Sequence, residues 1–112
     1  MVSQEAEKKI VELQTLEQNL QLFALQKQKF QTSLNEIENA LEDLKTAKGE
    51  TFKIIGNVMV AVNRDQLVKE LNEKKSVLEL RIKNIENQEE KFKEKAEKLQ
   101  SEVMEKLKNE KK

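Results

Sequence analysis

Apolar residues recur every seven positions in two interleaved series over residues 3–48. The first series is Ala6, Leu13, Leu20, Lys27, Leu34 and Leu41, and the second is Lys9, Leu16, Phe23, Phe30, Ile37 and Leu44. All of these positions except Lys9 and Lys27 are apolar, which is the heptad pattern of a coiled-coil seam. Gly49 follows as a natural helix stop. The pattern predicts a long helix over residues 3–48.

A second heptad pattern covers residues 63–109. Its two series are Val68, Lys75, Ile82, Glu89, Ala96 and Val103, and Leu71, Leu78, Ile85, Phe92, Leu99 and Lys106. Asn63 followed three residues later by Gln66 has the spacing of a capping box. The sequence therefore predicts a second helix over residues 63–109.

Lys27, Lys75 and Glu89 are polar residues at seam positions in the interior of the predicted helices. A polar group on a seam can fix register or oligomeric state at a cost in stability. If the helices pair antiparallel, Lys27 and Glu89 lie about one turn apart in height. Two interpretations stay open: an ion pair, or a lysine whose aliphatic stem packs on the seam while its ammonium group reaches water.

The heptads stop between residues 51 and 62, where β-branched residues dominate. Gly56-Asn57 lies midway and suits a two-residue turn of the primed type. We expect a β-hairpin with strands over 51–55 and 58–62, in which Ile55 faces Val58 and Lys53 faces Val60. The alternative, one unbroken helix, is disfavoured because Gly costs about 1 kcal/mol in a helix interior and β-branched residues add smaller penalties.

These elements predict a mainly α fold, a long antiparallel two-helix coiled coil joined by one β-hairpin, as a single domain over residues 1–112. Two helices cannot cover both a seam and an apolar hairpin, and an isolated hairpin is marginal in water. Its free edges favour pairing with another chain. We therefore expect oligomerisation through the hairpin residues Phe52, Ile54, Ile55, Val58, Met59, Val60 and Val62.

Composition excludes several functions. Lys+Arg and Asp+Glu both number 21, so there is no basic field for nucleic acid. The chain has 0 Cys and 0 His and only 2 Gly, which argues against a metal site, a phosphate-binding loop and the usual catalytic groups. We expect no enzyme, no cofactor, no signal peptide and no membrane span. The default compartment is then the cytoplasm.

Several segments together resemble a known family. They are Leu20-Gln21-Leu22, Phe52-Lys53-Ile54-Ile55-Gly56-Asn57-Val58-Met59-Val60 and Asn87-Gln88-Glu89-Glu90-Lys91. Their order and spacing resemble prefoldin, specifically the β-type subunit of archaeal prefoldin. Phe52 departs from the pattern, which has Tyr there; the change loses a hydroxyl but keeps the packing role. The α-type subunits carry two hairpins, and this chain has room for one.

The resemblance implies a hexamer of two α-type and four β-type subunits whose hairpins join into β-barrels. It also implies that coiled-coil tips hold unfolded proteins without ATP and pass them to a group II chaperonin. The apolar residues near both chain ends are then the candidate client-binding residues: Val2, Ala6, Ile10, Leu13, Leu99, Val103, Met104 and Leu107. For Ala6, Leu13 and Leu99, ordinary seam packing is the competing interpretation.

Two other functions fit parts of the pattern. A coiled-coil scaffold that only tethers folded partners predicts no general suppression of aggregation. A helix lying on a membrane surface is disfavoured because neither polar face is dominated by Lys and Arg.

Overall fold

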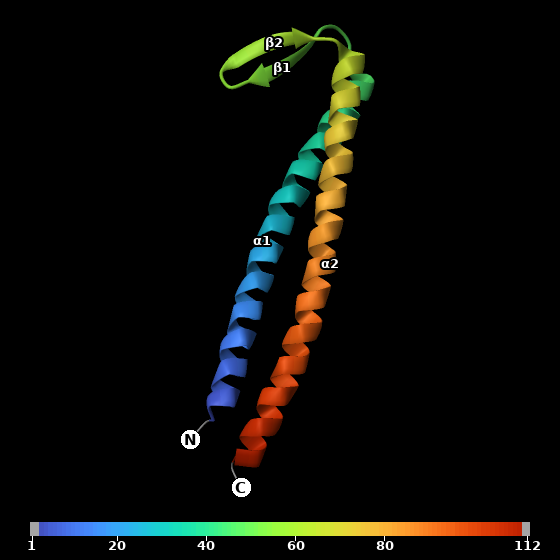
Figure 1. The fold of residues 1–112 in the computed structure, drawn as a ribbon. Helices are drawn as coiled ribbons and strands as arrows, with labels where there is room; N and C mark the ends of the chain where they lie inside the picture. Colours follow the sequence, from blue (N-terminus) through green and yellow to red (C-terminus); the bar gives the residue numbers. More distant parts are fainter. Residues whose placement is uncertain (1–2, 111–112) are drawn as a thin grey trace. The chain divides into compact units, whose positions relative to one another are not determined.

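The computed structural model describes residues 3–110 and consists of two helices joined by a two-stranded antiparallel hairpin, in the order α1, β1, β2, α2 (Figure 1). The chain divides into two compact units. The hairpin unit is Lys29–Ile82, and the terminal unit combines the described residues up to Gln28 with those from Lys83 onward. The mainly α fold with one hairpin, predicted from the heptads and the Gly-Asn turn, is confirmed.

Helix α1 spans Gln4–Thr46. Its first turn is capped by Ser3, whose hydroxyl oxygen accepts a hydrogen bond from the backbone N–H of Ala6 at 3.1 Å. Glu5 and Glu7 lie in this turn, where the helix dipole favours negative charge. The helix ends shortly before Gly49, which adopts a positive φ of 97° and allows the chain to leave the helical direction.

The hairpin pairs β1, Thr51–Ile55, with β2, Val58–Val62. The register places Ile55 opposite Val58 and Lys53 opposite Val60, as predicted. Gly56 has a φ of 60°, whereas no non-glycine residue among residues 3–110 has a positive φ. A positive φ at only the first of the two turn residues is typical of a type II′ turn, whose twist matches that of the strands.

Helix α2 spans Arg64–Glu110. Asn63 caps it, because its side-chain oxygen accepts a hydrogen bond from the N–H of Gln66 at 3.1 Å. The Arg64 guanidinium donates to the backbone carbonyl of Ala47, one of the free carbonyls just beyond α1. This contact joins the two helix ends that flank the hairpin.

The heptad positions form the helix interface in each unit. Every position of the four predicted series is buried or half-buried, including the polar ones. In the terminal unit the rings of Phe23 and Phe92 meet edge to face at 5.0 Å between centroids, a favoured aromatic geometry. In the hairpin unit Arg81 lies over the Phe30 ring at 5.7 Å. Such a two-helix interface leaves no interior in which the hairpin can be buried.

Neither helix contains, within the described residues, an apolar stretch of the length and hydropathy that crossing a bilayer requires.

Candidate functional site

The hairpin has two faces, because successive side chains of a strand point to opposite sides. The register places Phe52 opposite Ala61 and Ile54 opposite Met59, and these four residues form what we call the outer face. The other strand residues form the inner face, which carries the single charged side chain of the two strands, Lys53. The hairpin projects away from the helix ends that it connects (Figure 1).

Most of the predicted assembly residues are exposed, and they lie on both faces of the hairpin. On the outer face Ile54 is 68% and Met59 63% exposed, and on the inner face exposure ranges from 61% at Val58 to 40% at Val60 among the exposed residues. Phe52, Ile55 and Val58 are exposed as well, and Val62 is half-buried. Exposed apolar residues grouped in this way are typical of an interaction surface rather than of a finished monomer.

An ion pair connects the inner face to α2. The Lys53 ammonium lies 2.7 Å from Oε1 of Glu70, and Lys74, one helical turn further along α2, lies 3.3 Å from the same oxygen. The hydrogen bonds from Lys53 and then Lys74 lower the pKa of the Glu70 carboxyl. Glu70 therefore stays ionised at neutral pH and keeps Lys53 directed at the helix.

The candidate client-binding residues differ widely in exposure. Ala6 and Val103 are buried at 0% and 7%, so they can reach a client only if the helix ends separate. Ile10, Leu13, Leu99 and Leu107 are half-buried. Met104 is 65% exposed and stands off the seam. Val2 lies outside the described residues.

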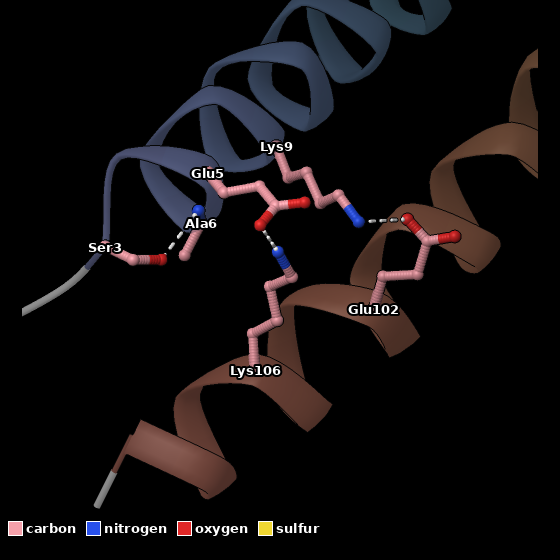
Figure 2. Close-up of polar contacts among 6 residues, drawn as sticks. All are labelled: Ser3, Glu5, Ala6, Lys9, Glu102 and Lys106. Carbon is pink, nitrogen blue, oxygen red and sulfur yellow. Dashed lines mark hydrogen bonds and ion pairs between the residues drawn. The ribbon is translucent and has the colours of Figure 1, made fainter.

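Ion pairs cross between the helices at the same end of the terminal unit (Figure 2). Lys9 lies 2.9 Å from Glu102, and Lys106 contacts Glu5. The hydrogen bond from Lys106 lowers the pKa of Glu5, and the hydrogen bond between Lys9 and Glu102 raises the pKa of Lys9 and lowers that of Glu102. Because Lys9 and Lys106 occupy seam positions, charged pairs take the place of apolar contacts at this end of the seam.

An open groove runs along the terminal unit beside these pairs. Its lining combines apolar side chains, among them Val11, Leu16 and Leu99, with Lys95 and Lys98. Val11, which is 60% exposed, was not among the predicted site residues. The signal that identifies it is an apolar residue lying outside both heptad series. Leu22, Leu25, Val77 and Leu80 are exposed for the same reason.

The polar seam residues Lys27 and Glu89 form an ion pair at 2.7 Å in the terminal unit. Of the two interpretations left open by the sequence, the ion pair is the one observed. Glu89 is only 8% exposed, and its hydrogen bond with Lys27 raises the pKa of the lysine. Across residues 3–110 no cluster of three or more potential metal ligands is found.

Comparison with known proteins gives one consistent family. A family model described as a prefoldin subunit matches residues 7–110. The prefoldin subunit beta of Archaeoglobus fulgidus is 37% identical over 102 residues, covering 89% of this chain and 84% of that protein. The corresponding subunit of Sulfolobus acidocaldarius is 35% identical, covering 92% and 84%. The crystal structure of the prefoldin beta subunit from Thermococcus strain KS-1 superimposes with a TM-score of 0.85 at 31% identity, covering 94% of each chain.

Proposed function

The chain belongs to the prefoldin family of chaperone subunits, and from this premise we propose that it is an ATP-independent holdase subunit. In this proposal residues 1–112 act as one prefoldin domain in the cytoplasm. The chain assembles through its hairpin, captures unfolded proteins at the helix ends that carry the termini, and delivers them to a group II chaperonin.

The observation that carries the proposal is the exposed apolar hairpin. Most of its apolar residues are exposed, and Ile54 and Met59 on the outer face are among the most exposed apolar side chains of residues 3–110. Strand edges and an apolar face together favour pairing with another hairpin. An α-type prefoldin subunit is the proposed partner, in a hexamer of two α-type and four β-type chains.

Client capture is assigned to the terminal unit. Met104 and the half-buried Ile10, Leu13, Leu99 and Leu107 present limited apolar surface between charged pairs. Each such end binds weakly, and several ends in one complex hold a single client through avidity. Methionine suits this role because its flexible side chain adapts to irregular apolar surfaces.

Native mass, measured for the chain alone and mixed with an α-type archaeal prefoldin subunit, tests the assembly. A defined mixed hexamer is expected. A stable homodimer that ignores the α-type subunit would instead favour the alternative, a coiled-coil scaffold without chaperone activity, in which the hairpin only seals the dimer.

Truncation tests the capture site. A series that removes residues 98–112 stepwise is expected to keep the hexamer and to lose suppression of aggregation of a chemically unfolded protein. A charge-preserving comparison, Met104→Ser in the full chain, separates loss of apolar contact from loss of helix. If the variant that lacks all of residues 98–112 still suppresses aggregation fully, the assignment of capture to this end is wrong.

A further inference from the structure

The two faces of the hairpin are similar in apolar character, so strand pairing alone does not determine which face turns toward α2. The inner face has Ile55, Val58 and Val60, and the outer face has Phe52, Ile54 and Met59. A hairpin with either face outward would satisfy its own backbone hydrogen bonds equally well. Something outside the strands must therefore select the orientation.

We propose that the ion pair of Lys53 with Glu70 is an orientation lock that presents the outer face of the hairpin to a neighbouring prefoldin subunit. This inference rests on the proposed assembly function and assigns two positioning residues to it. Lys53 and Glu70 do not contact the partner; they determine which apolar face the partner meets.

Three observations support the lock. Lys53 is the single charged side chain among the ten strand residues, and it lies at the middle of β1. Its ammonium is 2.7 Å from the Glu70 carboxylate on α2. The inner-face residues nearest the helices, Thr51, Lys53 and Val62, are half-buried, whereas Ile55, Val58 and Val60 of that face and all four outer-face residues are exposed. The charged residue therefore marks the face that turns toward α2.

The lock also works against the wrong orientation. Turning the inner face outward would carry the Lys53 ammonium into an apolar interface without its partner, and an unpaired buried charge is strongly disfavoured. An inward-pointing charge on a strand is a recognised way to prevent unwanted edge or face pairing. Lys74, which shares the Glu70 oxygen at 3.3 Å, supports Glu70 and contacts the hairpin only through it.

The expected effect per chain is modest and multiplies on assembly. An exposed ion pair of this kind changes the ratio of two orientations by about threefold. Because the two faces are otherwise similar, losing the pair lowers the competent fraction from about three quarters to about one half of the chains. A complex with four such chains then forms with an apparent constant lowered by about fivefold, because each chain must be in the competent orientation.

Two measurements on the full-length chain test the lock. The first is the concentration midpoint for assembly with an α-type subunit, for wild type, Lys53→Gln, Glu70→Gln and the charge swap K53E/E70K. The second is a spin-label distance between Asn57→Cys at the hairpin turn and Asn72→Cys on α2, labelled without interference because the chain has 0 Cys. Glu42→Gln, which removes a neighbouring exposed ion pair of the same unit, is the matched control.

The lock is supported if both single variants broaden the distance distribution and raise the midpoint, and if the charge swap reverses both effects. The Glu42→Gln control must change the midpoint by less than the single variants. Unchanged distances in the single variants would overturn the lock, whatever happens to assembly, and so would broadened distances with a wild-type midpoint. If the wild-type chain does not assemble with the α-type subunit, the proposed function fails, and the distance measurement still decides whether Lys53 and Glu70 orient the hairpin.

Discussion

The hairpin and the end of the terminal unit both carry apolar side chains, but they differ in where their charged residues lie. On the hairpin, Ile54 and Met59 are more than 60% exposed, and the one strand charge is directed away from the outer face. At the terminal end most apolar residues are half-buried, and the pairs Lys9–Glu102 and Lys106–Glu5 stand beside them. An uninterrupted apolar surface suits permanent assembly, whereas small apolar areas between ion pairs suit weak and reversible binding.

The largest expected effect is on the hairpin. Ile54→Lys with Met59→Lys places two ammonium groups on the outer face, and burying them would cost several kcal/mol in each chain. We expect complete loss of the mixed oligomer in native mass measurements, with helix content by circular dichroism retained. The matched control is Leu80→Lys, an exposed apolar position on α2 outside the hairpin. If the double variant forms the mixed oligomer at the same concentration as the wild type, the hairpin is not the assembly surface that distinguishes it from the terminal end.

The next effect is at the terminal end. Met104→Gln removes the most exposed of the candidate client-binding side chains that the structure describes. Its apolar contact is worth about 1 kcal/mol, which corresponds to about a fivefold weaker hold on a client per end. The measurement is suppression of aggregation against chaperone concentration, with the hexamer verified in the same samples. Gln100→Ala, an exposed change on the same helix, serves as the control.

A smaller effect concerns stability in the terminal unit. Replacing both Lys27 and Glu89 by Leu removes a pair in which only the Glu89 side chain is largely buried. Such replacements are neutral or stabilising, here by at most about 1 kcal/mol because Lys27 is partly exposed. Glu89→Gln alone leaves Lys27 without its charge partner and is expected to destabilise by a similar amount. Thermal unfolding followed by circular dichroism compares the three chains. A double variant less stable than Glu89→Gln would show that the pair itself contributes most of the local stability.

The smallest effect is the pH dependence of the terminal end. Lysine partners lower the pKa values of Glu5 and Glu102 below 4.5, so the stabilisation from these pairs is complete above that pH and is lost as pH falls through the lowered values. The pKa of Lys9 is raised above 10.5, so its contribution is lost only when pH rises through the raised value. Chemical shifts of the terminal turns, measured by NMR between pH 6 and pH 2, are expected to show fraying in acid. In a variant with Glu5→Gln and Glu102→Gln, the same turns should be frayed already at pH 6.

Much of this architecture follows from local rules that operate along the chain. The seven-residue spacing of Leu13, Leu20 and Leu34 is enough to predict the face that α1 buries. Gly56-Asn57 predicts the strand register, because a two-residue turn permits one pairing. Gly49 predicts the helix stop to within a few residues.

The remaining features depend on offsets that local rules do not determine. Lys53 contacts Glu70 only because the hairpin turns its inner face toward α2. The alternation of side chains along a strand does not predict which of the two faces will do so. Lys27 and Glu89 were predicted at similar heights, but the contact depends on the stagger of the two helices. Val11 was not predicted, because its position outside the heptad series does not by itself show that it lines a groove.

The Gly-Asn turn at the centre of the chain also determines the order in which contacts close. Lys53 and Glu70 are 17 residues apart, whereas Lys27 and Glu89 are 62 apart. Joining the more distant pair first would cost about 1 kcal/mol more in loop-closure entropy. Folding is therefore expected to proceed as a zipper from the hairpin outward, and the contacts nearest the termini close last and open first. An end that opens first can expose Ala6 and Val103 while the rest of the chain stays folded. The position of one turn therefore determines which end of the helices unfolds locally.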